Sequence, residues 1–301
     1  MRFRPGRALI LLACALVLGF AARSEGEAVF VSRMVWTMDD PAFGGWSGLE
    51  LSTDGSAFTA IGDRGWLTNG VLIRTGAGRL TGIDAAPMRR LDDTADAFIG
   101  DSVRDAEGLA LAPDGRVFVS FEGVRRVMSY PDARGMEPTL LPIYRDFIGL
   151  TPNTSLEALA IGVDGALYTL PEAIHGGGPF PVYRFDGAKW QVFARVRNLD
   201  DGFVPVGADI GPDGRFYLLE RKLRRRIGFA SRVRRFDLGA EGLAGEVLLL
   251  RTRPGTHDNL EGLAAWRDAA GRMRLTMVSD DNFGPWQKTE LVEYLLPSER
   301  R

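Results

Sequence analysis

Apolar and polar positions alternate in short runs separated by Asp-Gly turns, a pattern that predicts β-hairpins. The clearest copy runs from Asp105 to Glu122 and comprises an apolar stretch, the turn Pro113-Asp114-Gly115 and a second alternating stretch. The glycine supplies the positive backbone angles that a tight hairpin turn needs. Related stretches begin at Trp46, Ser155, Gly207 and Asn259. The copies recur roughly every 50 residues, a period typical of radial β-repeat folds.

The repeats differ in their number of predicted strands. The second repeat predicts four strands, at residues 108–112, 117–121, 126–130 and 139–144. The last repeat predicts three, at residues 262–266, 273–278 and 290–295, and the β-rich run 28–38 has no hairpin partner of its own. An N-terminal strand that joins the last repeat would remove both exposed sheet edges. We therefore predict an all-β fold, a single β-propeller of five blades in a ring closed by the N-terminal strand.

Two other architectures are compatible with the same pattern. Six blades would result if the gap of about 60 residues between the first two copies contained another repeat. An irregular β-sandwich would also contain many short strands. Linker-like composition is missing between the repeats, so the 301-residue chain predicts a single propeller domain over residues 28–297.

The N-terminus has the layout of a secretory signal peptide. Arg2, Arg4 and Arg7 precede an apolar run over residues 8–22, which is short for a membrane span. Small residues at 19 and 21 favour a signal peptide covering residues 1–21. Cys14 lies in the middle of the apolar run, so lipidation is the weaker alternative. We expect a periplasmic or secreted protein without stable membrane insertion.

Composition narrows the range of functions. Cys14 is the only cysteine, so cleavage would leave neither disulfide nor thiolate chemistry. The formal net charge is −2, and loss of the three leader arginines makes the chain more acidic. An acidic chain is a poor partner for nucleic acid, whose phosphates require a basic face. We expect a monomer with no nucleic-acid partner.

Acidic residues recur at both ends of the predicted hairpins. Glu107 and Glu122 lie on either side of the Asp114-Gly115 turn at nearly equal separation, so both should lie at the open end, about 24 Å from the turn. The same arithmetic applies to Glu157 with Glu172 and to Glu261 with Asp280, while Asp63 and Glu220 hold the late position in the first and fourth repeats. A closed ring would gather these acids at one mouth of the central channel.

Carboxylates gathered in this way repel one another unless a cation compensates them. Oxygen ligands favour a hard cation, and calcium tolerates irregular carboxylate rings better than magnesium does. The candidate metal ligands are Glu107, Glu157, Glu261, Asp63 and Asp280. Alternatively, these acids pair with arginines such as Arg64 and Arg221.

The fourth repeat departs from the pattern, because Pro205-Val206 stands where the early glutamate is expected. Whether Asp209 substitutes for that glutamate is left open by the sequence. Other hydrolytic motifs are absent, including a Gly-x-Ser-x-Gly elbow, a His-Glu-x-x-His pair and a phosphate-binding glycine loop. Of the two histidines, His175 lies in a glycine-rich loop, and His257 lies close to the predicted mouth.

Several of these motifs together resemble the phytase-like family, labelled "esterase-like activity of phytase". They are Trp46-Ser-Gly-Leu-Glu50, Asp105-Ala-Glu-Gly-Leu-Ala110, Val206-Gly-Ala-Asp209 and Asp258-Asn-Leu-Glu-Gly-Leu-Ala264, and they recur in order through the predicted mature chain. The resemblance implies an exported β-propeller distantly akin to calcium-dependent phosphoester hydrolases. It assigns no catalytic residue by position.

Three functional interpretations follow. The first is a calcium-dependent hydrolase of a small-molecule ester or phosphoester, with Arg64, Arg221 or His257 as candidate catalytic residues. The second is a non-catalytic periplasmic binding or scaffold propeller. The third is a sugar- or lactone-acting propeller, in which Trp46, Trp66 and Trp286 would stack on the substrate.

The leader predicts a measurable change in mass. Intact-mass spectrometry of the exported protein should show the loss of about 21 residues at the N-terminus. A diacylglycerol-sized addition on Cys14 would instead identify a lipoprotein.

Overall fold

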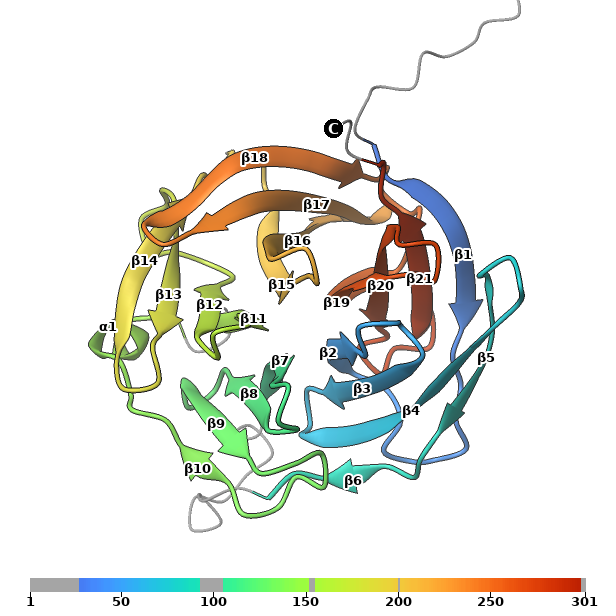
Figure 1. The fold of residues 1–301 in the computed structure, drawn as a ribbon, viewed down its shortest axis with the longest axis horizontal. Coiled ribbons are helices and arrows are strands. Elements are labelled where there is room, and N and C mark those ends of the chain that lie inside the picture. Colours follow the sequence, from blue (N-terminus) through green and yellow to red (C-terminus); the bar gives the residue numbers. More distant parts are fainter. Residues whose placement is uncertain (1–26, 93–104, 152–154, 200, 299–301) are drawn as a thin grey trace, which may run out of the picture.

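The repeats form five antiparallel sheets around one axis, as Figure 1 shows for the computed structural model of this protein. The structure describes residues 27–92, 105–151, 155–199 and 201–298. Each sheet places one strand beside the axis and the others progressively farther out (Figure 1). The fold is therefore the predicted five-bladed β-propeller, and the sandwich and six-blade alternatives are wrong.

The blades are numbered in chain order, from the inner strand outward. Blade 1 consists of β2 (Trp46–Leu51), β3 (Ala57–Gly62), β4 (Trp66–Arg74) and β5 (Leu80–Ala85), with the short β6 (Arg89–Arg90) beside β4. Blade 2 consists of β7 (Ala106–Leu111), β8 (Val117–Phe121), β9 (Arg126–Tyr130) and β10 (Thr139–Leu140). Blade 3 consists of β11 (Leu156–Ile161), β12 (Leu167–Pro171), β13 (Phe180–Phe185) and β14 (Trp190–Val196).

The remaining blades have longer strands. Blade 4 consists of β15 (Val204–Ile210), β16 (Arg215–Arg224), β17 (Gly228–Gly239) and β18 (Gly242–Arg251). Blade 5 consists of β19 (Asn259–Arg267), β20 (Met273–Asp280), β21 (Glu290–Leu295) and β1 (Val29–Val35). The helix α1 (Arg145–Ile148) connects blades 2 and 3. In the described part of the chain, no helix has the length and apolar character needed to span a membrane.

The Asp-Gly turns have the same local structure from blade to blade. Gly115 adopts a φ of 91°, in the left-handed region that favours glycine. The Asp114 side chain accepts a hydrogen bond from the Arg116 backbone N–H at 3.1 Å. Asp54 and Asp164 accept the equivalent bond, from Ser56 and Ala166 respectively. The repeated Asp-Gly pair therefore forms the hairpin turns for a local chemical reason.

The N-terminal strand completes the last blade, as predicted. β1 pairs with β21 in antiparallel register, from Val29 opposite Leu295 to Val35 opposite Glu290. The chain then passes inward, and the Trp36 ring stacks on the buried Trp46 ring of blade 1 with centroids 4.6 Å apart. The first described segment of the chain thus joins blade 5 to blade 1.

The five inner strands approach one another closely at the middle of the channel. Each contributes a small residue there, and these are Gly48, Gly108, Ala158, Gly207 and Gly262. A Cβ atom on Gly108 would lie 2.5 Å from the Leu159 Cβ of the next blade, and one on Gly207 would lie 2.2 Å from the Glu261 carbonyl oxygen. The waist therefore retains about 10 Å³ of space, too little for an organic ligand. The two ends of the channel are separate sites.

Each inner strand also carries a β-bulge beside this waist. The register slips at Ser47, Glu107, Glu157, Val206 and Glu261, each directly before the small residue. A bulge leaves one residue without a ladder partner and changes the direction of its side chain. Three of the five bulges carry a glutamate, and in the fourth blade Val206 takes its place as the sequence indicated.

Removal of β1 tests the closure of the ring. A protein that lacks residues 28–38 should aggregate, because β21 becomes an exposed edge and the Trp46 core loses Trp36. Size-exclusion chromatography and thermal melting would measure the effect. A monomeric, cooperatively melting truncation with the parental melting temperature would contradict the role of β1.

Candidate functional site

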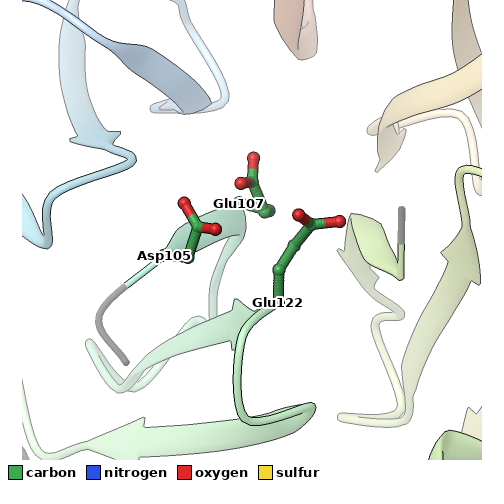
Figure 2. Close-up of side chains that lie close together, drawn as sticks. All are labelled: Asp105, Glu107 and Glu122. Carbon is green, nitrogen blue, oxygen red and sulfur yellow. The ribbon is translucent and has the colours of Figure 1, made fainter. Parts of the chain in front are cut away.

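Three carboxylates meet at one mouth of the channel. Oxygen atoms of Asp105, Glu107 and Glu122 all lie within 4.8 Å of one another, and Figure 2 shows the three side chains converging. Asp105 directly precedes β7, Glu107 occupies the bulge of β7, and Glu122 directly follows β8. All three belong to blade 2.

The backbone of the hairpin brings this group together. The Glu122 N–H donates to the Asp105 carbonyl at 2.8 Å, which extends the β7–β8 ladder by one pair. The Ser155 N–H of the next blade donates to the Glu122 carboxylate at 2.6 Å. Because the bulge turns Glu107 toward the other two acids, three carboxylates crowd the end of a single hairpin.

Two acids of the neighbouring blades extend the cluster. The Asp63 carbonyl accepts a hydrogen bond from the Ala106 N–H at 2.9 Å, which joins blade 1 to the start of β7. Burial and the nearby Asp280 carboxylate raise the pKa of Asp63 to about 7. Burial, reinforced by Asp281, raises the pKa of Asp280 to about 6. The Asp63 Oδ1 atom is buried and has no hydrogen-bond partner among the described residues.

Burial and neighbouring carboxylates also raise the pKa values of two glutamates in the bulges, Glu107 and Glu157. Burial, followed by repulsion from Glu122 and Asp105, raises the pKa of Glu107 well above its usual range. Burial and repulsion from Glu107 and Glu172 do the same for Glu157. Carboxylates this close together favour protonation or a bound cation over simultaneous ionisation. For these acids, burial and mutual repulsion outweigh the attraction of the nearest described arginines, which are Arg64 beside Asp63 and Arg221 near Glu107 and Glu157.

Arg221 neutralises the other part of the mouth. Its guanidinium donates to Glu172 of blade 3 and to Asn259 of blade 5, both at 3.0 Å, and it also pairs with Glu261. The Asn259 amide donates a further hydrogen bond to Glu261 at 2.7 Å. Glu261 is thus held by an arginine and an amide, as the arginine-pairing alternative predicts for it. Arg221 thus lies on the side of the mouth where blade 4 carries Val206 at the bulge position instead of a glutamate.

Glu220 is fully buried in blade 4 and forms an ion-pair network there. Arg232 and Arg234 each donate two hydrogen bonds to its carboxylate, at 2.6–2.7 Å. Asp201 and Glu246 pair with the outer nitrogens of the two arginines. The late acid of blade 4 is therefore bound within the sheet and serves its structure.

The three candidate catalytic residues lie in different environments. Arg221 lies at the mouth. The exposed Arg64 places its guanidinium 3.4 Å from the centroid of the Phe283 ring, next to Asp63. His257 is buried in blade 5, where its ring stacks on Phe30 and its Nε2 atom hydrogen-bonds the Tyr294 hydroxyl at 2.6 Å.

Asp209 does not substitute for the missing glutamate of blade 4. Its carboxylate lies past the waist, where it accepts a hydrogen bond from the Ala265 N–H at 2.6 Å. Trp46 is fully buried against Trp36, so it cannot stack on a substrate. Asp105 is not among the metal ligands that the sequence predicts, although its position opposite Glu122 in the predicted hairpin indicates the same mouth.

A cleft opens at the mouth beside Arg221. It has a volume of about 340 Å³, and its lining includes Glu172, Arg221, Lys222, Asn259 and Asn282. Asn282 and Phe283 adopt φ values of 47° and 48°, which are strained for residues other than glycine. The backbone N–H of Asn282 donates a hydrogen bond to the Asp280 carboxylate at 2.6 Å. The mouth thus combines a carboxylate cluster with a cleft that contains basic side chains.

Fold and site define a five-bladed β-propeller with an acidic channel mouth. Residues 41–283 match the family described as "Phytase-like: Esterase-like activity of phytase". The chain belongs to this family, which confirms the resemblance found in the sequence motifs. Comparison with curated proteins gives no match.

Solved structures with a similar fold are remote in sequence. A calcium-binding protein, regucalcin, from Agrobacterium tumefaciens has 13% identity and a TM-score of 0.47, covering 90% of this chain and 97% of its own. A protein of unknown function from Dyadobacter fermentans has 12% identity and a TM-score of 0.48, covering 92% and 100%. A putative gluconolactonase has 14% identity and a TM-score of 0.41, covering 93% and 96%. These similarities are too remote to indicate a function.

The raised pKa values predict how stability depends on pH. Asp63 has a folded pKa of about 7 and Asp280 of about 6, both above the value of about 4 in an unfolded chain. Between these values the folded state binds more protons, so stability should fall as pH rises from 5 to 8. Acids with lowered pKa values, such as Asp268 at about 2, are ionised in both states over this range.

Thermal melting in the presence of a chelator would measure this effect. The melting temperature of the parent should be highest near pH 5, and Asp63→Asn should flatten the curve between pH 5 and 8. Asp186→Asn, which removes an acid from an exposed turn, should leave the curve unchanged. A parental melting temperature that rises with pH would contradict the protonation of the cluster.

Proposed function

We propose that this protein is an exported hydrolase of ester or phosphoester bonds that holds a divalent cation, calcium, at its acidic mouth. The observation that carries the proposal is the convergence of oxygen atoms of Asp105, Glu107 and Glu122 within 4.8 Å, whereas the hydrogen bonds of Arg221 go to other residues of the mouth. Family membership supports the same assignment, because the family is named for an esterase-like activity.

The residues present fit a hard cation. Every donor in the cluster is a carboxylate oxygen, the ligand type that calcium prefers. The buried Asp63 Oδ1 atom, which accepts no hydrogen bond from the described residues, is an additional donor beside Asp105. Asp105, Glu107 and Glu122 would hold the ion, with Asp63 as a further ligand or neighbour. When bound, calcium would neutralise this charge and polarise an ester or phosphoryl oxygen.

The protein's own side chains supply the remaining functions. Asp63 is the candidate general base that would take a proton from the attacking water, because it lies beside Asp105 and its buried Oδ1 atom accepts no hydrogen bond from the described residues. Arg221 and Lys222 line the adjacent cleft of about 340 Å³ and would orient an anionic substrate oxygen. The alcohol released by cleavage would leave through the open side of the cleft. The closed waist prevents exit through the channel.

The cellular location belongs to the same proposal. The predicted leader lies outside the described residues, and the arginines and apolar run at the N-terminus support export to the periplasm or beyond. Calcium is the abundant hard cation outside the cell, which suits a weak carboxylate site. A small-molecule ester or phosphoester is the expected substrate.

Calcium should stabilise the folded protein and support hydrolysis. An ion that binds only the folded state at a hundredfold excess over Kd contributes about 2.7 kcal/mol, so the melting temperature should rise by several degrees. Glu107→Gln and Glu157→Gln keep side-chain size but remove a charge, and both should reduce this response. A screen of phosphomonoesters, carboxylic esters and lactones, with calcium or a chelator, would identify the reaction.

The matched control is Asp114→Asn, because Asp114 is an exposed acid at the far end of the same hairpin as Glu107. It should leave the calcium response unchanged. Suppose the parent shows no calcium response, and Glu157→Gln changes its stability equally with and without chelator. The acids would then pair with protein groups only, and the hydrolase proposal would lose its main support.

A further inference from the structure

A second open cavity lies between blades 1 and 2, at the turn end of the channel. It has a volume of about 730 Å³, within the size range of small-molecule sites. Its floor is one face of blade 1, and its wall consists of Leu111 at the end of β7 and of Ala112 and Pro113 in the turn that follows. The closed waist separates this cavity from the acidic mouth.

The sheet register explains which side chains form the floor. Glu50 lies opposite Thr59 and Thr59 lies opposite Asn69, so these three polar residues form one cross-strand row. Ala57 lies opposite Val71 and Val71 opposite Asp84, which makes a second row on the same face. All six residues line the cavity.

The cavity exists because blade 1 lacks a ring that three other blades contain. In each blade, one residue of the second strand lies opposite the inner-strand residue that follows the small waist residue by two positions. This second-strand residue is Phe118 in blade 2, Tyr168 in blade 3 and Tyr217 in blade 4. In blade 5 it is Thr276, which is covered by Trp266 through a 2.9 Å hydrogen bond. In blade 1 it is Thr59, and no ring fills the space.

Glu50 gives this cavity its chemical character. The corresponding residue is alanine in blades 2, 3 and 5, at Ala110, Ala160 and Ala264. Glu50 is 7% exposed, and the exposed Asp84 adds a second carboxylate at the rim. None of the described residues that line the cavity is basic. Burial and the charge of Asp209 raise the pKa of Glu50, so a cation placed beside it would relieve an unfavourable environment.

We propose that the cavity between blades 1 and 2 is a binding site for a small organic amine with a flat apolar body. The apolar body would occupy the space that an aromatic ring fills in blades 2, 3 and 4. The ammonium group would pair with Glu50, and Asn69 and Asp84 would offer further polar contacts. A charge-assisted pair that is shielded from water is among the stronger polar contacts in proteins.

Titration calorimetry with 2-phenylethylamine and the full mature chain would test this site, with 2-phenylethanol and phenylacetate as neutral and anionic probes of similar shape. The amine should bind saturably, about tenfold or more tightly than the alcohol, and phenylacetate should not bind. Glu50→Gln should weaken amine binding by about tenfold while leaving alcohol binding unchanged. Thr59→Phe should block both probes by restoring the missing ring.

Asp186→Asn is the control, since it removes an acid from an exposed turn of blade 3 and should not alter binding. Equal affinities for the three probes, no saturable amine binding, or parental amine affinity in Glu50→Gln would each overturn the proposal. If Thr59→Phe does not fold, Glu50→Gln decides the outcome alone. Because this cavity is separate from the acidic mouth, loss of the calcium response in Glu107→Gln should leave amine binding intact.

Discussion

The close approach of the five inner strands at the channel waist determines the rest of this structure. Gly48, Gly108, Gly207 and Gly262 each lie where a Cβ atom would collide with the neighbouring blade, and Ala158 completes the ring. Close packing at this radius allows five blades to close and leaves only about 10 Å³ on the axis. The small residues therefore allow the inner strands to pack this closely, and the close packing separates the two ends of the channel.

The bulge beside each small residue determines which side chain points toward the mouth of the channel. An unpaired residue directly before the glycine directs its side chain toward the mouth, and in blades 2, 3 and 5 that residue is glutamate. Blades 1 and 4 carry Ser47 and Val206 instead, and their acids, Glu50 and Asp209, stand three residues later on the other side of the waist. Acidity is thus divided between the two ends according to the blade.

Arginines then decide which acids are available at the mouth. Arg221 binds Glu172 and Glu261, while Arg232 and Arg234 enclose Glu220 within blade 4. Among the described residues, the mouth carboxylates of blade 2 and the neighbouring Asp63 and Asp280 form no ion pair with an arginine, and burial and mutual repulsion raise the pKa values of Glu107, Asp63 and Asp280. The arginines are therefore distributed unequally, so that Glu220 of blade 4 is held in ion pairs while the mouth acids of blade 2 remain clustered with one another.

The sequence alone determined the features that depend on local chemistry and on repetition. Asp-Gly pairs predicted the turns, the alternating runs 117–121 and 126–130 predicted β8 and β9, and the three-strand last repeat predicted closure by β1. The nearly equal spacing of the acids on either side of each turn also predicted that Glu107 and Glu157 lie at one end of the channel. Local backbone preferences and a fixed strand period carry this information along the chain.

Only the tertiary structure decided what each acid does, because that depends on partners far away in the sequence. Arg221 of blade 4 reaches Glu172 of blade 3 and Glu261 of blade 5, and Asp63 approaches Asp105 only when blades 1 and 2 pack together. His257 turned out to lie against Phe30, and the cavity beside Glu50 depends on a ring that Thr59 does not provide. Electrostatic fields and packing volumes are properties of the assembled blades, so no single repeat could reveal them.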